Sequence, residues 1–564
     1  MIESRKPPAG TVQIIGPARR ETTRDMLRVG IVLDSYVSSA WVAKTIQDVQ
    51  ASGFAQIVLV VVDLDHNRQG PRKAGQSFLF QLYERWDYKR NKATDDALES
   101  ADLSSLLNGI PEIKTAAQCD GQYKIATADE VAAVLDHNLD VLLDLGSLGF
   151  SGDILRAARY GLWSFSPGGA ANGCAIPPYW AQLFRQGAIC GSALLVLTDS
   201  PLQRRILYQS FASVDQTSLY LTRNPTYWKT AAFALRSLRE LHERGGAFIE
   251  SLPEDTESVA DAQPANLSMV VFAARYLNRW VRARLASLNP SSRTKWCIAI
   301  RRRSETHAFD DGEGYQIVPS PSDRFYADPF LIEKDGKLLL FFEDLPFAEG
   351  RGVISYCELQ PDGSAGPVIE VLRRPYHLSY PYLFEEQGAI YMIPETKGNR
   401  TVELYRATSF PTEWALEAVL LDNIYAVDAT IYQQDGRYWM FAGTSDGLYS
   451  NCDELSIFYA DALRGPWKSH PRNPVVSDVR RARPAGKLFH DGSRLIRPSQ
   501  DCGKAYGFAL VFSEILKLDE TNYAERSIGR LQPDLSRGQL GNHTYNRTES
   551  FEVIDINVAA KFQS

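Results

Sequence analysis

The 564-residue sequence lacks the cysteine patterns that indicate a disulfide framework or a structural zinc site. Its seven cysteines are Cys119, Cys174, Cys190, Cys297, Cys357, Cys452 and Cys502. They are odd in number and scattered, and no two of them form a Cys-x-x-Cys pair, whereas disulfide scaffolds and zinc sites use regular short spacings. We therefore expect free thiols and a reducing compartment.

Long apolar runs and an excess of positive charge are absent as well. No stretch approaches the roughly 20 apolar residues of a membrane-spanning helix, and the first residues lack the apolar core of a signal peptide. The net charge of −7 disfavours nucleic acid as a partner, because proteins that bind it usually carry a basic excess. These absences favour a cytoplasmic globular protein.

The familiar catalytic motifs are also missing. The eight histidines are dispersed, and the sequence contains no His-Glu-x-x-His motif, no Gly-x-Ser-x-Gly elbow and no Walker motif. A zinc hydrolase, an α/β-hydrolase and a P-loop enzyme are therefore disfavoured. We expect neither a metal ion nor a cofactor.

Residues 26–245 predict an α/β domain. Two buried strands, at 27–34 and 57–63, flank a helical pattern at 39–51, which is typical of a parallel β–α–β unit. Strands and helices continue to alternate up to a helix around 227–244. Residues 1–25 are polar and contain several Pro and Gly, so we expect a flexible leader.

Residues 246–293 are predicted to connect this domain to a second one. Their first part is rich in Pro, Asp, Glu and Ser, as linkers are, and residues 267–288 then show helical spacing. Val270, Leu277 and Trp280 mark an apolar side of this helix, and four arginines mark the other side. Two interpretations stay open: a connecting helix packed on one domain, or a surface helix that makes peripheral contact with an anionic membrane.

Residues 294–560 predict a repeated all-β domain. Short strands alternate in hydrophobicity, and the Asp-Gly turns at 334–337 and 434–437 both precede aromatic strands. Similar units recur at intervals of roughly 45 to 55 residues, which favours a β-propeller of four to six blades. Periodicity alone leaves a β-sandwich open.

Carboxylates recur at the entrances or ends of these strands. They are Asp328, Glu343, Asp344, Glu395, Asp428 and Asp501. In a propeller, corresponding positions of successive blades converge on one central mouth, where carboxylates repel one another and some of their pKa values rise. Such a set can supply the acid and the base of sugar chemistry. The alternative is that each carboxylate only caps a turn.

A basic segment lies in the same domain. Residues 477–487 contain three arginines and one lysine, and Arg497 follows shortly afterwards. Arginine binds phosphate and carboxylate in a bidentate manner, so Arg483 and Arg497 favour a phosphate-linked sugar as ligand. A solvated loop is the alternative. The aromatic residues Tyr326, Tyr380, Tyr382 and Trp439 are expected either to stack on sugars or to lie in the core.

The strings FYADPF, YMIPET, AVDATIY and RLIRPSQDC carry a resemblance to a known family. These strings, in this order along the chain, resemble the propeller at the N-terminus of plant glucosamine inositolphosphorylceramide transferases. That domain is itself similar to the five-bladed propellers of arabinanase- and xylosidase-type glycoside hydrolases. The resemblance implies five blades with a base, a pKa modulator and an acid on different blades. Asp328 matches the base motif, and Asp428 and Glu395 match by blade position. In the plant proteins, glycosyl transfer is attributed to a separate C-terminal domain.

Residues 26–240 resemble the formyltransferase fold of methionyl-tRNA formyltransferase and of sugar N-formyltransferases. That family carries an Asn-x-His before a Gly-rich loop and an Asp before a Leu-Tyr. The matching positions here are Ser164, Ser166 and Arg205. Formyl transfer needs a base and a group that polarises the tetrahedral intermediate, which these residues do not supply. The resemblance therefore implies a fold without formyl transfer and without formyl-tetrahydrofolate.

Together these observations predict a carbohydrate-active protein of glycan biosynthesis, with Asp328, Glu395 and Asp428 as catalytic residues. Glu343, Asp344, Arg483, Arg497 and Asp501 are the predicted substrate-binding residues. The predicted activity is transfer or binding of an activated or phosphate-linked sugar, which favours a transferase. Three alternatives remain: a glycoside hydrolase, a non-catalytic sugar-binding module and, least favoured, a sugar N-formyltransferase.

Overall fold

The computed structural model describes residues 26–63, 77–115, 118–120, 123–147, 149–168, 177–198, 203–255, 264–288, 294–303, 308–360 and 362–559. The expected leader, residues 1–25, lies outside them. Contacts divide the chain between Arg279 and Trp280 into two compact units. We call them the N-terminal and the C-terminal unit.

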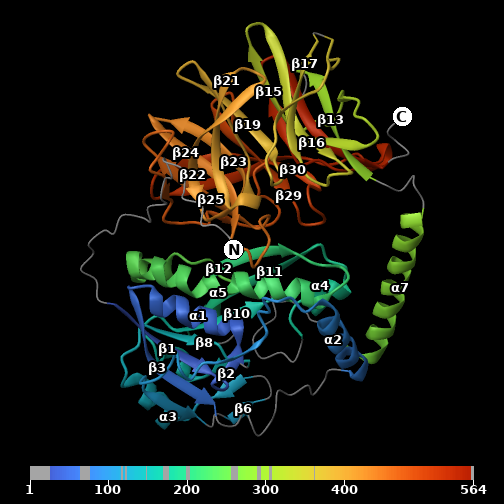
Figure 1. Ribbon diagram of the computed structural model, residues 1–564. Coiled ribbons are helices and arrows are strands. Elements are labelled where there is room, and N and C mark those ends of the chain that lie inside the picture. Colours follow the sequence, from blue (N-terminus) through green and yellow to red (C-terminus); the bar gives the residue numbers. More distant parts are fainter. Residues whose placement is uncertain are drawn as a thin grey trace, which may run out of the picture. The chain divides into compact units, whose positions relative to one another are not determined.

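A mixed seven-stranded sheet forms the centre of the N-terminal unit (Figure 1). Its order is β12 (Arg204–Ser213), β11 (Ile189–Leu197), β10 (Leu162–Pro167), β8 (Val141–Asp144), β1 (Leu27–Leu33), β3 (Ala55–Asp63) and β5 (Glu112–Thr115). The five strands from β10 to β5 are parallel, and β11 and β12 are antiparallel to their neighbours. The predicted α/β architecture is therefore present, whereas the formyltransferase-like fold stays a prediction.

Helices cover both faces of this sheet (Figure 1). Alternate residues of β1 face opposite sides, so Val29 and Ile31 pack with α1 (Ala40–Ala51) and α5 (Leu219–Arg244), while Val32 packs with α3 (Ala128–Leu135). The other elements are β2 (Val37–Ser39), α2 (Phe78–Asn91), β4 (Ser100–Asp102), β6 (Gln118–Asp120), β7 (Tyr123–Ile125), β9 (Phe150–Ser151), η2 (Asp153–Arg156), α4 (Trp180–Phe184), α6 (Gly246–Glu250) and α7 (Asn266–Leu288).

Five antiparallel sheets make the C-terminal unit a five-bladed β-propeller. Blade I contains β15 (Arg324–Lys334), β16 (Lys337–Pro346), β17 (Val353–Leu359) and β18 (Ile369–Leu372). Blade II contains β19 (Ser379–Glu386), β20 (Ala389–Glu395), β21 (Thr401–Ser409) and β22 (Glu413–Asp422). Blade III contains β23 (Tyr425–Gln434), β24 (Arg437–Ser445), β25 (Glu454–Ala460), β26 (Lys468–Ser469) and β27 (Val476–Ser477). Blade IV contains β28 (Phe489–Asp491), β29 (Arg494–Asp501), β30 (Ala509–Leu518) and β31 (Tyr523–Leu531).

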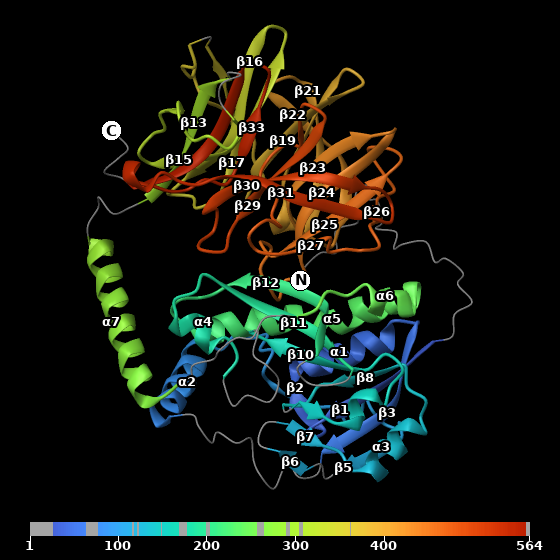
Figure 2. The same ribbon diagram turned by 180° about the vertical axis from the view of Figure 1, so that it is seen from behind.

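Blade V joins the two ends of the propeller sequence. It contains β13 (Thr294–Arg302), β14 (Gln316–Ile317), β32 (Gln539–Gly541), β33 (Tyr545–Arg547) and β34 (Phe551–Ala559). The early strand β13 pairs along its length with the last strand β34, so green and red segments lie side by side in Figure 2. This pairing closes the ring and leaves no open blade edge between its first and last strands.

The predicted Asp-Gly turns connect the first two strands of blades I and III. Asp335 and Gly336 have φ values of 51° and 73°, and Asp435 and Gly436 have 52° and 76°. Two consecutive positive φ values define the turn type that matches the twist of a hairpin. The prediction of these two hairpins is confirmed.

Candidate functional site

The first strands of blades I, II and III share a bulge at the same place. The pairing register shifts between Ala327 and Phe330, between Ser379 and Tyr382, and between Val427 and Thr430. Each bulge begins with a residue in the left-handed region: Asp328 with φ 51°, Tyr380 with φ 46° and Asp428 with φ 54°. Bulges re-aim side chains, and such strain concentrates at functional sites. The recurrence of these three residues is therefore structural as well as a feature of the sequence.

Asp328 is buried at the junction of three blades. Its Oδ1 accepts a hydrogen bond from the Thr544 hydroxyl at 2.7 Å, and its Oδ2 accepts one from the backbone N–H of Tyr380 at 3.2 Å. Its own N–H donates to Asp555 Oδ2 at 3.0 Å. Burial raises the pKa of Asp328 to about 6, against the lowering effect of His543. Asp328 is therefore mostly ionised at neutral pH, but only by a narrow margin.

Glu343 and Glu395 stand opposite these bulges on the second strands of blades I and II. Glu343 pairs with Ala327, and Glu395 pairs with Ser379. Burial, and then the nearby carboxylates, raise the pKa of Glu395 to about 8 and the pKa of Glu343 well above its usual range. Asp328, Glu343, Glu395 and Asp428 thus influence one another electrostatically, and we call them the carboxylate cluster.

Arg483 contacts two carboxylates of this cluster. Its Nε lies 2.6 Å from Asp428 Oδ2, and its Nη2 lies 3.4 Å from Glu395 Oε2. Gln500 adds a hydrogen bond from Nε2 to Asp428 Oδ2 at 3.1 Å. A guanidinium between two carboxylates neutralises part of their charge, and each of its three nitrogens has a partner in Asp428, Glu395 or Cys452.

Sequence reasoning missed the contribution of blade V and of the loop after β29. His543 is buried, and its Nδ1 lies 2.5 Å from Asp555 Oδ2. Its ring stacks on Trp296, with 4.0 Å between the centroids, and Tyr506 meets the ring edge-on. Tyr506 is 50% exposed, and Arg483 lies over its ring. These aromatic residues line one side of the carboxylate cluster.

Asp328, His543 and Asp555 also form a group with the composition of a metal site. Each residue has one potential ligand atom, and these three atoms all lie within 4.8 Å of one another. His543 Nδ1 and Asp555 Oδ2 are, however, in direct contact at 2.5 Å. Two ligand atoms that each lie about 2 Å from the same zinc ion would be farther apart than this. We therefore treat the group as an ion pair that supports Asp328.

Three predicted substrate-binding residues have partners elsewhere. Asp344 follows Glu343 on β16 and points to the opposite face, where Arg324 and Ser355 bind it. Arg497 is buried and bonded twice to Glu525, at 2.8 and 2.9 Å. Asp501 is paired with Arg530 at 2.6 Å. All four predicted aromatic residues belong to hydrophobic clusters: Tyr326, Tyr380, Tyr382 and Trp439. Tyr380 also contacts the site through its backbone N–H, which donates to Asp328.

The formyltransferase-like positions lie in the N-terminal unit. Ser164 and Ser166 are buried on β10, and the Ser164 hydroxyl donates to Asp144 Oδ2 at 3.4 Å. Burial raises the pKa of Asp144 to about 7. Arg205, on β12, donates instead to the backbone carbonyl of Ile249 at 3.3 Å. Ser164 therefore has an acidic neighbour, whereas Arg205 is bound to the main chain.

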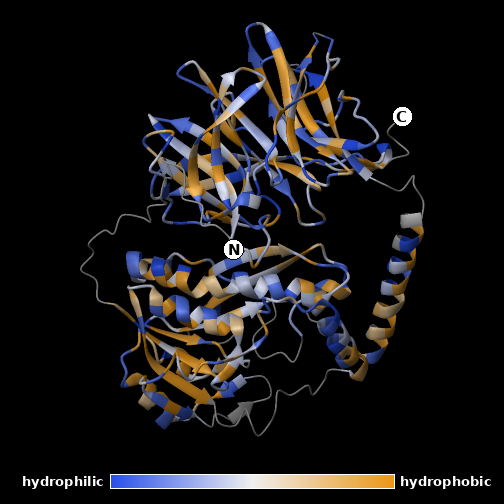
Figure 3. Cartoon of the chain, in the orientation of Figure 1, coloured by the Kyte–Doolittle hydropathy of each residue, from blue (hydrophilic) through white to orange (hydrophobic). Residues whose placement is uncertain are grey.

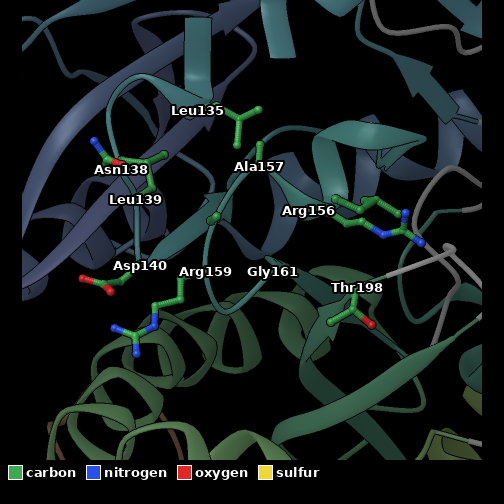
Figure 4. A pocket seen from close by; sticks show the side chains of 11 residues that line it. Leu135, Asn138, Leu139, Asp140, Arg156, Ala157, Arg159, Gly161 and Thr198 are labelled. Atoms are coloured by element: carbon green, nitrogen blue, oxygen red, sulfur yellow. The ribbon is translucent and has the colours of Figure 1, made fainter. Parts of the chain in front are cut away.

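A cavity of about 590 Å³ lies at another edge of the same unit. It is lined by the end of α3, by η2 and by the residues that precede β8 and β10 (Figure 4). The side chains of Arg156 and Arg159 point in different directions, so they do not converge on one ligand (Figure 4). In open parallel sheets, ligands bind at the carboxyl ends of the strands, whereas this cavity faces the amino ends of β8 and β10.

The C-terminal unit is thus a five-bladed propeller with an acidic, arginine-containing centre. Residues 316–557 match the family model described as the N-terminal part of glucosamine inositolphosphorylceramide transferase 1. Similar proteins include glucosamine inositolphosphorylceramide transferase 1 of Oryza sativa subsp. japonica, 38% identical over 206 residues, which are 36% of this chain and 27% of the relative. The Arabidopsis thaliana protein of that name is 35% identical over 236 residues, which are 41% of this chain and 30% of the relative. The matches thus span less than a third of these relatives.

Solved structures similar to this chain include glycoside hydrolases. A thermostable family-43 glycoside hydrolase is 14% identical over 37% of this chain and 76% of its own, with a TM-score of 0.29. An exo-β-1,3-galactanase from Clostridium thermocellum is 12% identical over 39% of this chain and 53% of its own, with a TM-score of 0.30. The blade count above rests on the sheets of this chain alone.

Proposed function

We propose that the propeller binds an activated, phosphate-linked sugar and transfers the sugar to an acceptor during glycan synthesis. One observation carries this proposal: two carboxyl groups with unlike proton affinities, Asp328 and Glu395, share one cluster with Arg483. Pairs of titratable groups whose surroundings separate their pKa values are typical of acid–base sites. The family match covers the N-terminal part of proteins named as transferases, so it supports a role in glycan synthesis and leaves the transfer step to be tested on the propeller itself.

Each residue of the cluster has a role in this proposal. Asp328 accepts the proton of the acceptor hydroxyl, because it is largely ionised at neutral pH. Glu395 donates a proton to the departing phosphate oxygen, because it is largely protonated. Arg483 binds the phosphate charge, and Asp428 holds Arg483 in place. Tyr506, which is half-exposed, offers an aromatic surface to a sugar ring.

The names of the relatives suggest which substrates to test first. Glucosamine and inositolphosphorylceramide would correspond to an amino-sugar donor and a phosphoinositol-lipid acceptor. The experiment incubates the full chain with a panel of nucleotide sugars, with and without such lipids, and measures nucleotide release. Release that depends on both donor and acceptor supports transfer. A chain that binds sugars by calorimetry but turns over none of them would instead be a binding module.

The pKa values of Asp328 and Glu395 predict a bell-shaped dependence of the turnover rate on pH. The rate should rise as Asp328 ionises near pH 6 and fall as Glu395 loses its proton near pH 8. We expect Glu395→Gln to lose the alkaline limb, because glutamine does not titrate. The measurement is kcat/KM from pH 5 to 9 for both proteins. An alkaline limb that survives in Glu395→Gln would rule out Glu395 as the acid.

Glycoside hydrolysis is the second candidate, because hydrolases also use two carboxyl groups with different proton affinities. Arg483 disfavours it, since a neutral glycoside has no charge for this cation to bind. Arabinan and xylan fragments with chromogenic leaving groups test it directly. Sugar N-formylation is the least favoured candidate. Release of tetrahydrofolate when the protein is incubated with formyl-tetrahydrofolate and a sugar would support it.

We also propose that α7 places the protein on an anionic membrane, where a lipid acceptor is found. One side of α7 is buried through Met269 and Phe272, which pack against the aromatic residues of α2 and α4. The opposite side carries exposed apolar residues over about five turns: Leu267, Val270, Val271, Leu277, Val281 and Leu285. Apolar and polar residues alternate along this helix in Figure 3. Among the described residues, no helix is long and apolar enough to cross a membrane.

The charge of α7 favours a lipid surface. The helix contains four arginines and neither Asp nor Glu, although the chain as a whole has a net charge of −7. Arg282 is exposed beside the apolar stripe, and Trp280 is 55% exposed. A basic helix with Leu, Val and Trp on its exposed side is typical of helices that lie in the interface of anionic bilayers. A cytoplasmic location would place both nucleotide sugars and an anionic leaflet within reach.

We expect the protein to sediment with vesicles of phosphatidylcholine and phosphatidylserine more than with phosphatidylcholine alone. Leu277→Glu should abolish this binding, and Arg282→Gln should weaken it by about fivefold, because each basic residue near such a surface contributes about 1 kcal/mol. Leu516→Glu is the control, since Leu516 is similarly exposed but lies on the propeller. Equal binding of Leu277→Glu and the unaltered protein would exclude α7 as the membrane contact.

A further inference from the structure

Two cysteines lie together at the edge of the carboxylate cluster. Cys452 is in the loop between β24 and β25, and Cys502 directly follows β29. Both are free, and their thiols interact as hydrogen-bond partners. Cys452 is partly exposed, whereas Cys502 is buried. A reagent from solution would therefore reach Cys452 first.

Each of the two thiols also contacts a residue that binds Asp428. Nη1 of Arg483 lies 3.8 Å from Cys452 Sγ, and the Cys502 thiol donates to Gln500 Oε1 at 3.7 Å. Arg483 and Gln500 both bond to Asp428 Oδ2. Chemistry at the thiol pair therefore acts on the two residues that hold this carboxylate.

The surroundings also make Cys452 reactive. The hydrogen bond from Cys502, helped by Arg483 and opposed by burial, lowers the pKa of the Cys452 thiol to about 6. At neutral pH Cys452 is then mostly thiolate, which is the nucleophilic form. Cys357, in the same unit, is the opposite case, because burial raises its pKa to about 12.

We propose that Cys452 and Cys502 form a reversible disulfide by exchange with a small disulfide such as oxidised glutathione, and that this bond sets the charge of the carboxylate cluster. In the first step the Cys452 thiolate attacks one sulfur of the oxidant, which releases one glutathione thiolate. Cys502 then attacks Cys452 Sγ, gives its proton to solvent and releases the second glutathione. Two protein thiols are oxidised, and one glutathione disulfide is reduced to two glutathione molecules.

Disulfide formation removes a negative charge from the neighbourhood of Arg483. In the reduced state, the Cys452 thiolate and Asp428 both face this guanidinium. In the oxidised state only the carboxylates remain, so the site becomes more positive by one charge. We therefore expect an anionic ligand to bind about tenfold more tightly after oxidation. This second part rests on the proposed function, whereas disulfide formation does not.

The first experiment equilibrates the full chain in glutathione buffers of increasing oxidation and identifies linked peptides by mass spectrometry. We expect a Cys452–Cys502 peptide that disappears on addition of dithiothreitol. Brief alkylation of the reduced protein at neutral pH should label Cys452 and leave Cys357 unlabelled. Absence of the linked peptide at every buffer composition, with the protein folded by circular dichroism, would overturn the proposal.

The second experiment measures the affinity for inorganic pyrophosphate by calorimetry before and after oxidation. The unaltered protein should bind it more tightly when oxidised, and Cys452→Ser should lose this redox dependence. Cys502→Ser should stop at the mixed disulfide between Cys452 and glutathione, which mass spectrometry detects. Before oxidation, Cys452→Ser should bind more tightly than Cys502→Ser, because only the latter retains the thiolate. Equal affinities in all forms would contradict the charge effect. A disulfide that forms in a protein without any pyrophosphate binding would contradict the anionic ligand and leave the disulfide standing.

Discussion

Replacing Asp328 with asparagine is expected to lower the turnover rate by about 100-fold to 10,000-fold, the usual contribution of a general base. Asparagine is the suitable replacement because Asp328 has φ 51°, and Asn tolerates this left-handed conformation better than Ala does. The asparagine carbonyl can accept from the Tyr380 N–H, and its amide can donate to the Thr544 hydroxyl. The local structure should therefore persist, and kcat measured on the active donor reports the chemical role.

The stability of Asp328→Asn separates loss of function from unfolding. The folded-state pKa of Asp328 is raised from 3.8 to about 6, so the stability that its protonation provides is lost as the pH rises through 6. At pH 7 the ionised carboxylate thus costs stability, and its replacement should leave the melting temperature unchanged or higher. Asp344→Asn is the control on the same blade, and its turnover should equal that of the unaltered protein. Full turnover in Asp328→Asn would remove Asp328 from every catalytic scheme.

The sequence predicted that six carboxylates approach one another in the propeller, and four of them do so: Asp328, Glu343, Glu395 and Asp428. Asp328 and Asp428 begin equivalent bulges, and Glu343 and Glu395 face such bulges, so the repeat alone brings the four into one cluster. The repeat does not show which of two adjacent residues on a strand faces the cluster. Glu343 and Asp344 were both predicted to bind substrate, but neighbours on a strand point to opposite faces, and only Glu343 joins the cluster.

Residues outside the repeat could not be predicted in this way. His543 and Asp555 come from blade V, whose strands are separated by most of the propeller sequence and meet only when the ring closes. Tyr506, Cys452 and Cys502 lie outside the strands, where no periodicity places them. Arg483 and Arg497 looked equivalent as basic residues, yet Arg497 is buried against Glu525, a partner on β31 that charge patterns along the chain do not reveal.

The number of blades was also predicted only in part by the periodicity of the sequence. Periodicity predicted four to six blades and left a sandwich open, because twisted strands of similar length build both. The resemblance implied five blades, and the five sheets confirm that number. In the N-terminal unit, the alternating pattern of β1, α1 and β3 predicted the parallel core of the sheet. The formyltransferase-like resemblance remains a prediction there, since Ser164, Ser166 and Arg205 replace the residues that would identify that family.

Arg483 is the residue on which the electrostatic balance of the cluster depends. It contacts both Asp428 and Glu395, and its side chain is only 11% exposed. Removing one partner of a buried ion pair costs about 3–5 kcal/mol, because the remaining charge is left without compensation. Arg483→Met keeps much of the side-chain volume, so its effect should come from charge rather than from a cavity.

We expect Arg483→Met to lower the free energy of unfolding by about 3–5 kcal/mol at pH 8 and by clearly less at pH 5. The sign follows from Glu395, whose pKa is raised from 4.5 to about 8: its protonated form stabilises the fold, and this stability is lost as the pH rises through 8. At pH 5 Glu395 is neutral, so of these two carboxyl groups only Asp428 loses the cation that compensates its charge. Urea unfolding at both pH values, together with calorimetric binding of pyrophosphate, measures the effect.

Arg497→Met is the matched comparison for this prediction. Arg497 is also a buried arginine in a carboxylate pair, so its loss should destabilise the propeller to a similar extent. Of these two variants, only Arg483→Met should abolish pyrophosphate binding, because Arg483 contacts the carboxylate cluster and Arg497 does not. Adding Asp428→Asn to Arg483→Met should recover part of the lost stability, since it removes the carboxylate that the arginine had balanced. If pyrophosphate bound equally well to both single variants, the phosphate would not lie at Arg483, and the propeller would need another anion site to act on phosphate-linked sugars.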